Sequence, residues 1–304
     1  MNIFPARYDL AMAPPSWDFA AWLTNTSAAC AEGDMIGVRF FPGPSADGFR
    51  TNPPLAMRPE LRPWMLNHVC RGLMTVMLNV FEFTDSPDRS SPPYWVGGYG
   101  FRYSVERAMQ GPDHYPRKFQ AGPAAHQYVE RWLQNRYESE QVPAFITITV
   151  RRSSYHPDRN NDEFMGAVLE QLWVRGILAR TLQLVIVPDA ESVGLWDGEY
   201  LPAAYDVALR LALYEKAQLN IVGDNGPAGM LFNSNANYLM IQPLLPFDGG
   251  PDMRTWWRTH DGLDPEREQQ FPWASKLQMI LWDHPTTPTQ VTDVALSMLQ
   301  EISK

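Results

Sequence analysis

Paired arginines follow a stretch of apolar and β-branched residues in the middle of the chain. Arg151 and Arg152 come directly after Phe145 to Val150, and Arg159 lies a few residues further on. Such a stretch predicts a strand buried on both faces of a parallel sheet, and the pattern becomes helical from Glu163. Ligands of open α/β sheets bind beyond the carboxyl ends of strands, and a guanidinium matches phosphate oxygens bidentately. The arginines therefore predict a phosphate site, with ion pairs to carboxylates as the alternative.

Two other side chains stand beside these arginines. Tyr155 is expected to stack on a nucleotide base or a sugar, and His156 to help neutralise a phosphate. Packing of the tyrosine and termination of the strand by the histidine are the alternatives.

Two further loops are expected at the same edge of this sheet. Leu182 to Val187 predicts a strand that ends before Asp189 and Glu191, and either carboxylate could hold a ribose or sugar hydroxyl or cap a helix. Leu219 to Val222 predicts a strand that runs into the glycine-rich loop Asp224 to Gly229. Backbone N–H groups of such a loop can approach a phosphate, although glycine with proline also marks a plain turn.

Composition restricts the class of protein. The 304 residues suffice for two medium domains, and the net charge of −9 disfavours nucleic acid and anionic membranes as partners. Cys30 and Cys70 have no metal-ligand neighbours and form no disulfide framework, which favours a reduced, cytoplasmic setting. The N-terminus lacks the order of a signal peptide, and the helical run Met65 to Phe81 is too polar to span a bilayer.

The alternation of strand and helix patterns predicts an α/β protein. Residues 1–124 read as a small α/β domain, residues 125–287 as a doubly wound, Rossmann-like domain with a parallel sheet, and residues 288–304 as a C-terminal helix. Residues 86–123 lack periodicity and are expected to form an irregular connector. The expected strands are Tyr8 to Leu10, Met35 to Phe41, Val80 to Thr84, Phe145 to Val150, Leu182 to Val187, Leu219 to Val222 and Tyr238 to Ile241.

The segment from Pro143 to Pro243 resembles the nucleotide-sugar-binding domain of GT-B glycosyltransferases. Thr149-Val150-Arg151-Arg152-Ser153-Ser154 is similar to the fucosyltransferase motif His-x-Arg-Arg-x-Asp, with Thr149 replacing the histidine and Ser154 the aspartate. Val187-Pro188-Asp189-Ala190-Glu191 is similar to the next strand-end motif of that family. Asn225-Gly226-Pro227 resembles the Ser-Gly-Pro of bacterial heptosyltransferases. The N-terminal half looks like an uncharacterised bacterial glycosyltransferase-like group.

The resemblance implies two facing domains with a cleft between them, and a last helix that crosses back to the first domain. It implies an inverting transfer of a sugar of hexosyl, fucosyl or heptosyl type from a nucleotide diphosphate to an acceptor hydroxyl, in glycan biosynthesis. The donor would lie against the arginines, Asp189, Glu191 and Asn225 to Pro227. No cofactor and no metal are expected, since the sequence has no Asp-x-Asp motif. A noncatalytic nucleotide- or carbohydrate-binding protein and a nucleotide-sugar epimerase are the alternatives.

Three further residues are candidates for the acceptor side. Asp18 opens the first expected helix, where heptosyltransferases similarly place a catalytic aspartate, although an acidic first turn also simply suits the helix dipole. Arg50 follows Gly48-Phe49 in a loop and could bind an acceptor anion or a donor phosphate, or be solvated. His114 could line the cleft or belong to an aromatic linker turn.

Overall fold

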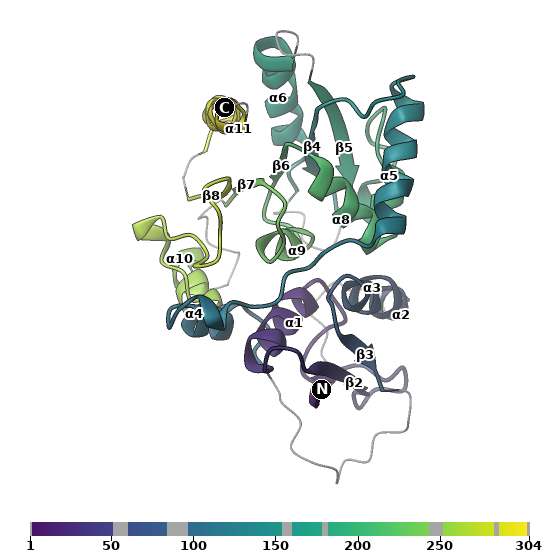
Figure 1. The fold of residues 1–304 in the computed structure, drawn as a ribbon, viewed down its shortest axis with the longest axis vertical. Coiled ribbons are helices and arrows are strands. Elements are labelled where there is room, and N and C mark those ends of the chain that lie inside the picture. Colours follow the sequence, from purple (N-terminus) through teal and green to yellow (C-terminus); the bar gives the residue numbers. More distant parts are fainter. Residues whose placement is uncertain are drawn as a thin grey trace.

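The chain forms two parallel sheets that lie at opposite ends of the molecule (Figure 1). The computed structural model describes residues 2–50, 60–83, 97–153, 160–177, 182–242, 252–282 and 286–302. The expected fold class, α/β with two mainly parallel sheets, is confirmed. No helix within these ranges is long and apolar enough to cross a membrane.

The first sheet has three parallel strands in the order β1-β2-β3. They are β1 (Ile3–Asp9), β2 (Met35–Phe41) and β3 (Val80–Glu82). β1 begins earlier than the sequence predicted, because Ala6 and Tyr8 alternate inward and pair in register with β2. The helix α1 (Asp18–Ala29) follows β1 and buries Phe19 and Trp22 against Tyr8.

The described residues between β2 and β3 include one helical segment. It consists of α2 (Leu61–Met65), a π-helical turn (Leu66–Cys70) and α3 (Arg71–Thr75). Its Val69 and Leu73 are buried in the same core as α1. In Figure 1 this segment and α1 lie between the two sheets.

The second sheet has five parallel strands in the order β5-β4-β6-β7-β8. They are β4 (Phe145–Val150), β5 (Gln183–Pro188), β6 (Leu219–Val222), β7 (Tyr238–Ile241) and β8 (Gln278–Leu281). β4 is buried at every position, as its composition predicted. β8 was not predicted, because it is a short strand within a segment rich in tryptophan and proline.

Helices cover both faces of this sheet. α6 (Asp162–Leu172) and α11 (Pro288–Ile302) pack on one face, and α5 (Pro123–Arg136) packs beside α8 (Val207–Lys216) on the other. Alternate residues of β4 serve the two faces: Ile146 and Ile148 join the core of α6 and α11, whereas Phe145 joins the core of α5 and α8.

The position of α11 corrects one expectation. Its Val291, Ala295 and Leu299 pack with Ile146 and Ile148 of β4, and the helix contacts α6 and β6. The expectation that the last helix crosses back to the first half is therefore wrong, because its apolar stripe is buried on the second sheet (Figure 1).

The connector between the halves is more regular than predicted. It contains α4 (Arg102–Ala108) and a 3₁₀ turn (Pro112–His114), both within the segment that lacked periodicity. Asn25 of α1 holds it in place: its Nδ2 donates to the carbonyls of Gly98 and Gly100, and its Oδ1 accepts from Ser104. One hydrophobic core runs from the first sheet into the second half.

Candidate functional site

A cleft of about 710 Å³ lies between the two halves. α1 and α2 contribute its wall from the first half, and the loops after β4, β5 and β6 contribute the wall from the second. Most of the described residues that the sequence singled out line this cleft, namely Asp18, Arg151, Asp189, Glu191, Asn225, Gly226 and Pro227. Tyr155, His156 and Arg159 lie outside the described residues, so their predicted roles stay predictions.

Strand order explains why the cleft opens at this point. β4 has β5 on one side and β6 on the other, so the chain reverses its direction of progress through the sheet between β4 and β6. Open α/β sheets bind ligands at such a switch point, beyond the carboxyl ends of the strands. Arg151 follows β4 and Asn225 follows β6, so both side chains belong to this position.

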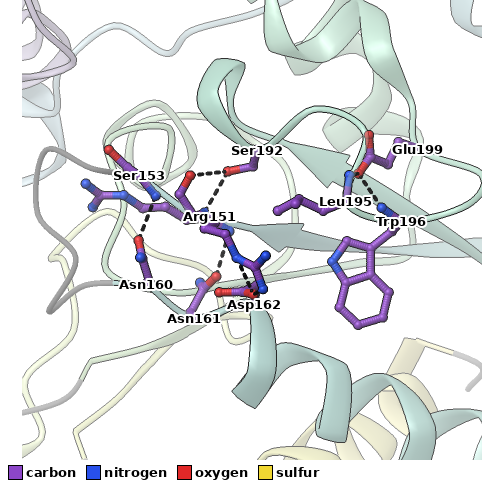
Figure 2. A network of polar contacts seen from close by, with 10 residues as sticks. Arg151, Ser153, Asn160, Asn161, Asp162, Ser192, Leu195, Trp196 and Glu199 are labelled. Carbon is purple, nitrogen blue, oxygen red and sulfur yellow. Dashed lines mark hydrogen bonds and ion pairs between the residues drawn. The ribbon is translucent and has the colours of Figure 1, made fainter.

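Two asparagines fix the backbone that carries Arg151 (Figure 2). The N–H of Arg151 donates to Asn161 Oδ1 at 2.7 Å, and the N–H of Asn161 donates back to the Arg151 carbonyl at 3.0 Å. The N–H of Ser153 donates to Asn160 Oδ1 at 2.7 Å. The asparagines therefore satisfy backbone groups that no neighbouring strand reaches, and the loop after β4 is held in one shape.

The paired arginines have different surroundings. Arg151 is 8% exposed, lines the cleft and forms no ion pair with a carboxylate among the described residues. Arg152 leaves the cleft: its Nε donates to Asp162 Oδ2 at 2.8 Å, its Nη2 reaches the same oxygen, and its side chain is 55% exposed. Arg152 thus takes the alternative role of an ion pair, and its predicted contact with a donor receives no support from this geometry.

An ion pair between a buried arginine and a carboxylate lies in the cleft wall. Asp189 Oδ1 lies 3.4 Å from Arg210 Nη2, and Arg210 is 1% exposed. Burial raises the pKa of Asp189 above its ordinary value, while the charges of Arg210 and Arg151 act in the opposite direction. Arg210 also donates to the carbonyls of Ala203 and Pro188, at 2.7 and 2.6 Å. Sequence reasoning did not single out Arg210, because it belongs to no motif.

The loop after β5 is held by carboxylates. Glu191 accepts a hydrogen bond from the Ser153 hydroxyl and so links this loop to that of Arg151. The buried carboxylate of Glu199 accepts from the N–H groups of Gly194, Leu195 and Trp196 at 2.7, 3.0 and 2.9 Å. Figure 2 shows Glu199 beside Leu195 and Trp196. Both loops are therefore fixed by bonds to charged acceptors, which are stronger than neutral ones.

Two buried donors in the cleft lack a hydrogen-bond partner among the described residues. They are Asn225 Nδ2 and Trp257 Nε1, on residues that are 6% and 5% exposed. The Asn225 Oδ1 accepts from the N–H of Ala228 at 3.2 Å, which orients the amide. A buried donor without a partner is costly, so an oxygen acceptor at either atom would stabilise the structure.

The wall near α1 contains a histidine that sequence reasoning missed. His260 belongs to a π-helical turn (Trp257–Asp261) after α10 (Met253–Trp256) and lines the cleft together with Asp18. Burial lowers the pKa of His260, but the hydrogen bond and charge of Asp261 and the charge of Asp18 outweigh it, so the pKa lies above its usual value. The i,i+4 spacing of Trp256 and His260 was the available signal, because it predicts stacking on a helix.

Arg50 and His114 lie away from the cleft. Arg50 follows the buried Phe49 and is half-buried. Burial raises the pKa of Tyr8 well above its ordinary value, and the charge of Arg50 acts against this shift. His114 ends the 3₁₀ turn of the connector, where its Nδ1 lies 3.0 Å from Arg107 Nη2. This position corrects the expectation that His114 lines the cleft. A ligand role for Arg50 stays a prediction.

Metal ligands do not gather in the part of the chain that the structure describes: it contains no group of three or more histidine, cysteine, aspartate or glutamate side chains able to hold an ion. The expectation that the protein needs no metal stays a prediction.

Comparison with known proteins gives only distant likenesses. No family model matches the sequence, and no curated protein matches it significantly. The chain is similar to the solved structure of E. coli ADP-heptose LPS heptosyltransferase II, with 13% identity, a TM-score of 0.48 and coverage of 100% of both chains. It is similar to a glycosyl transferase family 9 protein of Veillonella parvula, with 10% identity, a TM-score of 0.48 and coverage of 98% of both. For the iron-containing dodecameric glycosyltransferase TibC of enterotoxigenic E. coli, the identity is 12% and the TM-score 0.41, over 100% of this chain and 76% of that one. The names of all three describe transferases of glycosyl or heptosyl groups, the kind of protein that the sequence motifs resemble. At such low identities and TM-scores, the likeness assigns no activity to this chain.

Proposed function

We propose that the protein is a glycosyltransferase that binds a nucleotide-diphosphate sugar in the cleft and transfers the sugar to an acceptor hydroxyl. The transfer is inverting and needs no metal, and the acceptor is a glycan-type molecule. The motif resemblance around Arg151 and Asn225 supports this proposal from the sequence.

The observation that carries the proposal is the position of Arg151. Arg151 is a buried residue at the switch point of the second sheet, it lines the cleft, and it forms no ion pair with a carboxylate among the described residues. A buried guanidinium is stabilised by an anion, and a diphosphate would bind it with two charge-assisted hydrogen bonds. Asn225 Nδ2 and Trp257 Nε1 are further donors in the same cleft.

These groups fit the needs of the reaction. As the bond between the sugar carbon and the diphosphate oxygen breaks, negative charge grows on the diphosphate, and a fixed arginine stabilises that charge. The acceptor oxygen attacks from the opposite face of the sugar and must lose its proton there. Asp18 lies on the wall from the first half and takes part in removing this proton.

Thermal stability in the presence of GDP, UDP, ADP, CMP or dTDP tests the donor site. A ligand that binds only the folded state stabilises it by about 2.7 kcal/mol at a concentration of 100 Kd. One diphosphate should raise the melting temperature of the wild-type protein, and Arg151→Met should abolish the rise. Arg152→Met is the matched control, because Arg152 leaves the cleft for Asp162. The absence of any response, or equal loss in both variants, would refute the proposed donor site.

Transfer of a labelled sugar separates catalysis from binding alone. A transferase moves the label to an acceptor or to water and releases the nucleoside diphosphate. An epimerase would change the sugar while it stays on the nucleotide, and a noncatalytic binding protein would leave the donor intact. Either of the last two outcomes would contradict the proposed activity.

A further inference from the structure

His260 lies on a wall shared by two cavities. One is the main cleft, and the other is a smaller opening of about 290 Å³ on the side of α4. Tyr99 also borders both, whereas Arg102, Glu106 and Thr259 belong to the smaller cavity. His260 therefore borders both the cleft, where a ligand would bind, and the smaller cavity.

The imidazole of His260 is held on three sides. Its ring stacks on Trp256 with 4.1 Å between centroids and 22° between planes. Its Nδ1 lies 3.3 Å from Asp261 Oδ2, while Asp261 Oδ1 accepts from the N–H of Phe101 at 3.0 Å. Gly100 packs so tightly against the ring that a Cβ there would overlap Nδ1. A carboxylate on Nδ1 holds a proton at that atom and leaves Nε2 as the bare, basic nitrogen.

The charges around the ring favour its protonated form. Asp261 lies beside it on the same turn, and Asp18 faces it from α1. Arg102 and Glu106 of α4 pair with each other at 2.7 Å, so their charges offset one another. The net surroundings of His260 are negative, and they stabilise an imidazolium.

Building on the proposed transfer reaction, we propose that His260 is the general base that takes the proton of the acceptor hydroxyl and releases it to water in the smaller cavity. Asp261 is a positioning residue, and Asp18 stabilises the imidazolium that forms. An imidazole suits this task because its ordinary pKa is close to neutral pH, where a base works best.

Proton transfer accompanies the exchange of bonds at the anomeric carbon. The acceptor oxygen forms a bond to the anomeric carbon with its own electron pair, and its proton moves to His260 Nε2. The bond from the anomeric carbon to the diphosphate oxygen breaks, and its electrons stay on the diphosphate facing Arg151. The imidazolium then gives its proton to water, and the base is restored without a further reactant.

A long-range ¹H–¹⁵N spectrum of the histidine side chains tests the geometry. His260→Gln assigns the signal among the six histidines of the chain. The neutral ring should carry its proton on Nδ1, and Asp261→Asn should remove this preference. Asp18→Asn should lower the pKa of His260. A neutral ring protonated on Nε2 would overturn the proposal.

Kinetics test the proton step itself. The probes are UDP-glucose, GDP-mannose, ADP-glucose and dTDP-rhamnose with water as acceptor, and the readout is release of nucleoside diphosphate. His260→Gln should lower kcat about 10²–10⁴-fold with little change in KM, and it should remove the acidic limb of the pH profile. Added imidazole should restore part of the rate of His260→Gly.

His68→Gln is the matched control, because His68 also stacks on a tryptophan four residues earlier but is exposed and lies outside the cleft lining. It should keep the wild-type rate. Turnover that His260→Gln leaves unchanged would overturn the proton step alone. Failure of the wild-type protein to release any diphosphate would overturn the transfer reaction, and the proton step with it.

Discussion

At the residue scale, the buried guanidinium of Arg210 contributes to the stability of the second half. Its guanidinium donates to two backbone carbonyls and to the Tyr214 hydroxyl, and it pairs with Asp189. Arg210→Met leaves Asp189 buried without its partner, and the loss of one partner of a buried pair costs about 3–5 kcal/mol. We expect the free energy of unfolding in urea to fall by about this amount.

A surface pair provides the comparison for Arg210. Arg175 and Asp293 are both about half exposed, so Arg175→Met should cost no more than about 1 kcal/mol. Adding Asp189→Asn to Arg210→Met should restore part of the loss, because the stranded charge disappears. A cost for Arg210→Met as small as that for Arg175→Met would show that the buried pair contributes little.

The sequence predicted the same phosphate-binding role for Arg151 and Arg152, because both are arginines at the end of the same strand. Which of them enters the cleft depends on Asp162, which follows the loop and binds Arg152. Arg210 was invisible for a related reason: the carbonyls of Ala203 and Pro188 that justify its burial come from other elements. A sequence names the charges, whereas their partners are set by the fold.

At the element scale, a contact between two ionisable side chains joins α5 and α8. Glu215 of α8 accepts from the N–H of Ala121 at 3.3 and 3.2 Å and lies 3.0 Å from His126 Nε2 of α5. Burial raises the pKa of Glu215 from 4.5 to about 7. The folded state therefore binds this proton more tightly than the unfolded state, and the protein should lose stability as pH rises from about 5 to 8.

Melting curves across this pH range test the role of Glu215. Glu215→Gln should flatten the decline and stabilise the protein at pH 8 by about 1–2 kcal/mol, allowing for solvent screening. His126 has the opposite effect on the pH dependence of stability, because burial and the charge of Lys216 lower its pKa. The stability of Glu130→Gln should still decline as pH rises, since Lys216 lowers the pKa of Glu130. A wild-type protein that gains stability toward pH 8 would disprove the assignment.

The elements that sequence predicted well are those with strong periodicity or continuous burial, such as β4, β6 and α6. β8 and α4 were missed, because tertiary contacts rather than patterns define them. Gln278 opens β8 with an amide that donates to the carbonyls of Ser234 and Ala236. The place of α11 could not be predicted from the sequence, since an apolar stripe on a helix does not indicate which core it packs against.

At the scale of the whole molecule, the candidate site joins segments that are distant in sequence. Asp18 comes from the first half, Arg151 from the loop after β4, and His260 from the turn after α10. The common edge of the parallel strands was predictable, because successive carboxyl ends meet there. The wall opposite that edge could not be predicted from the sequence, since its formation depends on how α1 packs against the second half.

That packing depends on one close approach. Gly226 lies against the Trp17 ring at the start of α1, and a Cβ built there would overlap the indole. Gly229, one turn further on in α9 (Ala228–Phe232), leaves room: its Cβ would lie 3.6 Å from that of Ala20. Gly226→Ala should therefore push α1 away from the second sheet, whereas Gly229→Ala should fit.

We expect Gly226→Ala to lower the free energy of unfolding by about 1–3 kcal/mol, as overpacking does. It should also weaken the stabilisation by a nucleoside diphosphate, because both walls of the cleft separate. Gly229→Ala should stay within about 1 kcal/mol of the wild-type protein, since alanine favours a helix. Trp17→Leu in the Gly226→Ala background should recover part of the loss in a double-mutant cycle, because Trp17 is the group that clashes. If Gly226→Ala matched Gly229→Ala in urea unfolding and in ligand response, contact between Gly226 and Trp17 would not set the distance between the halves.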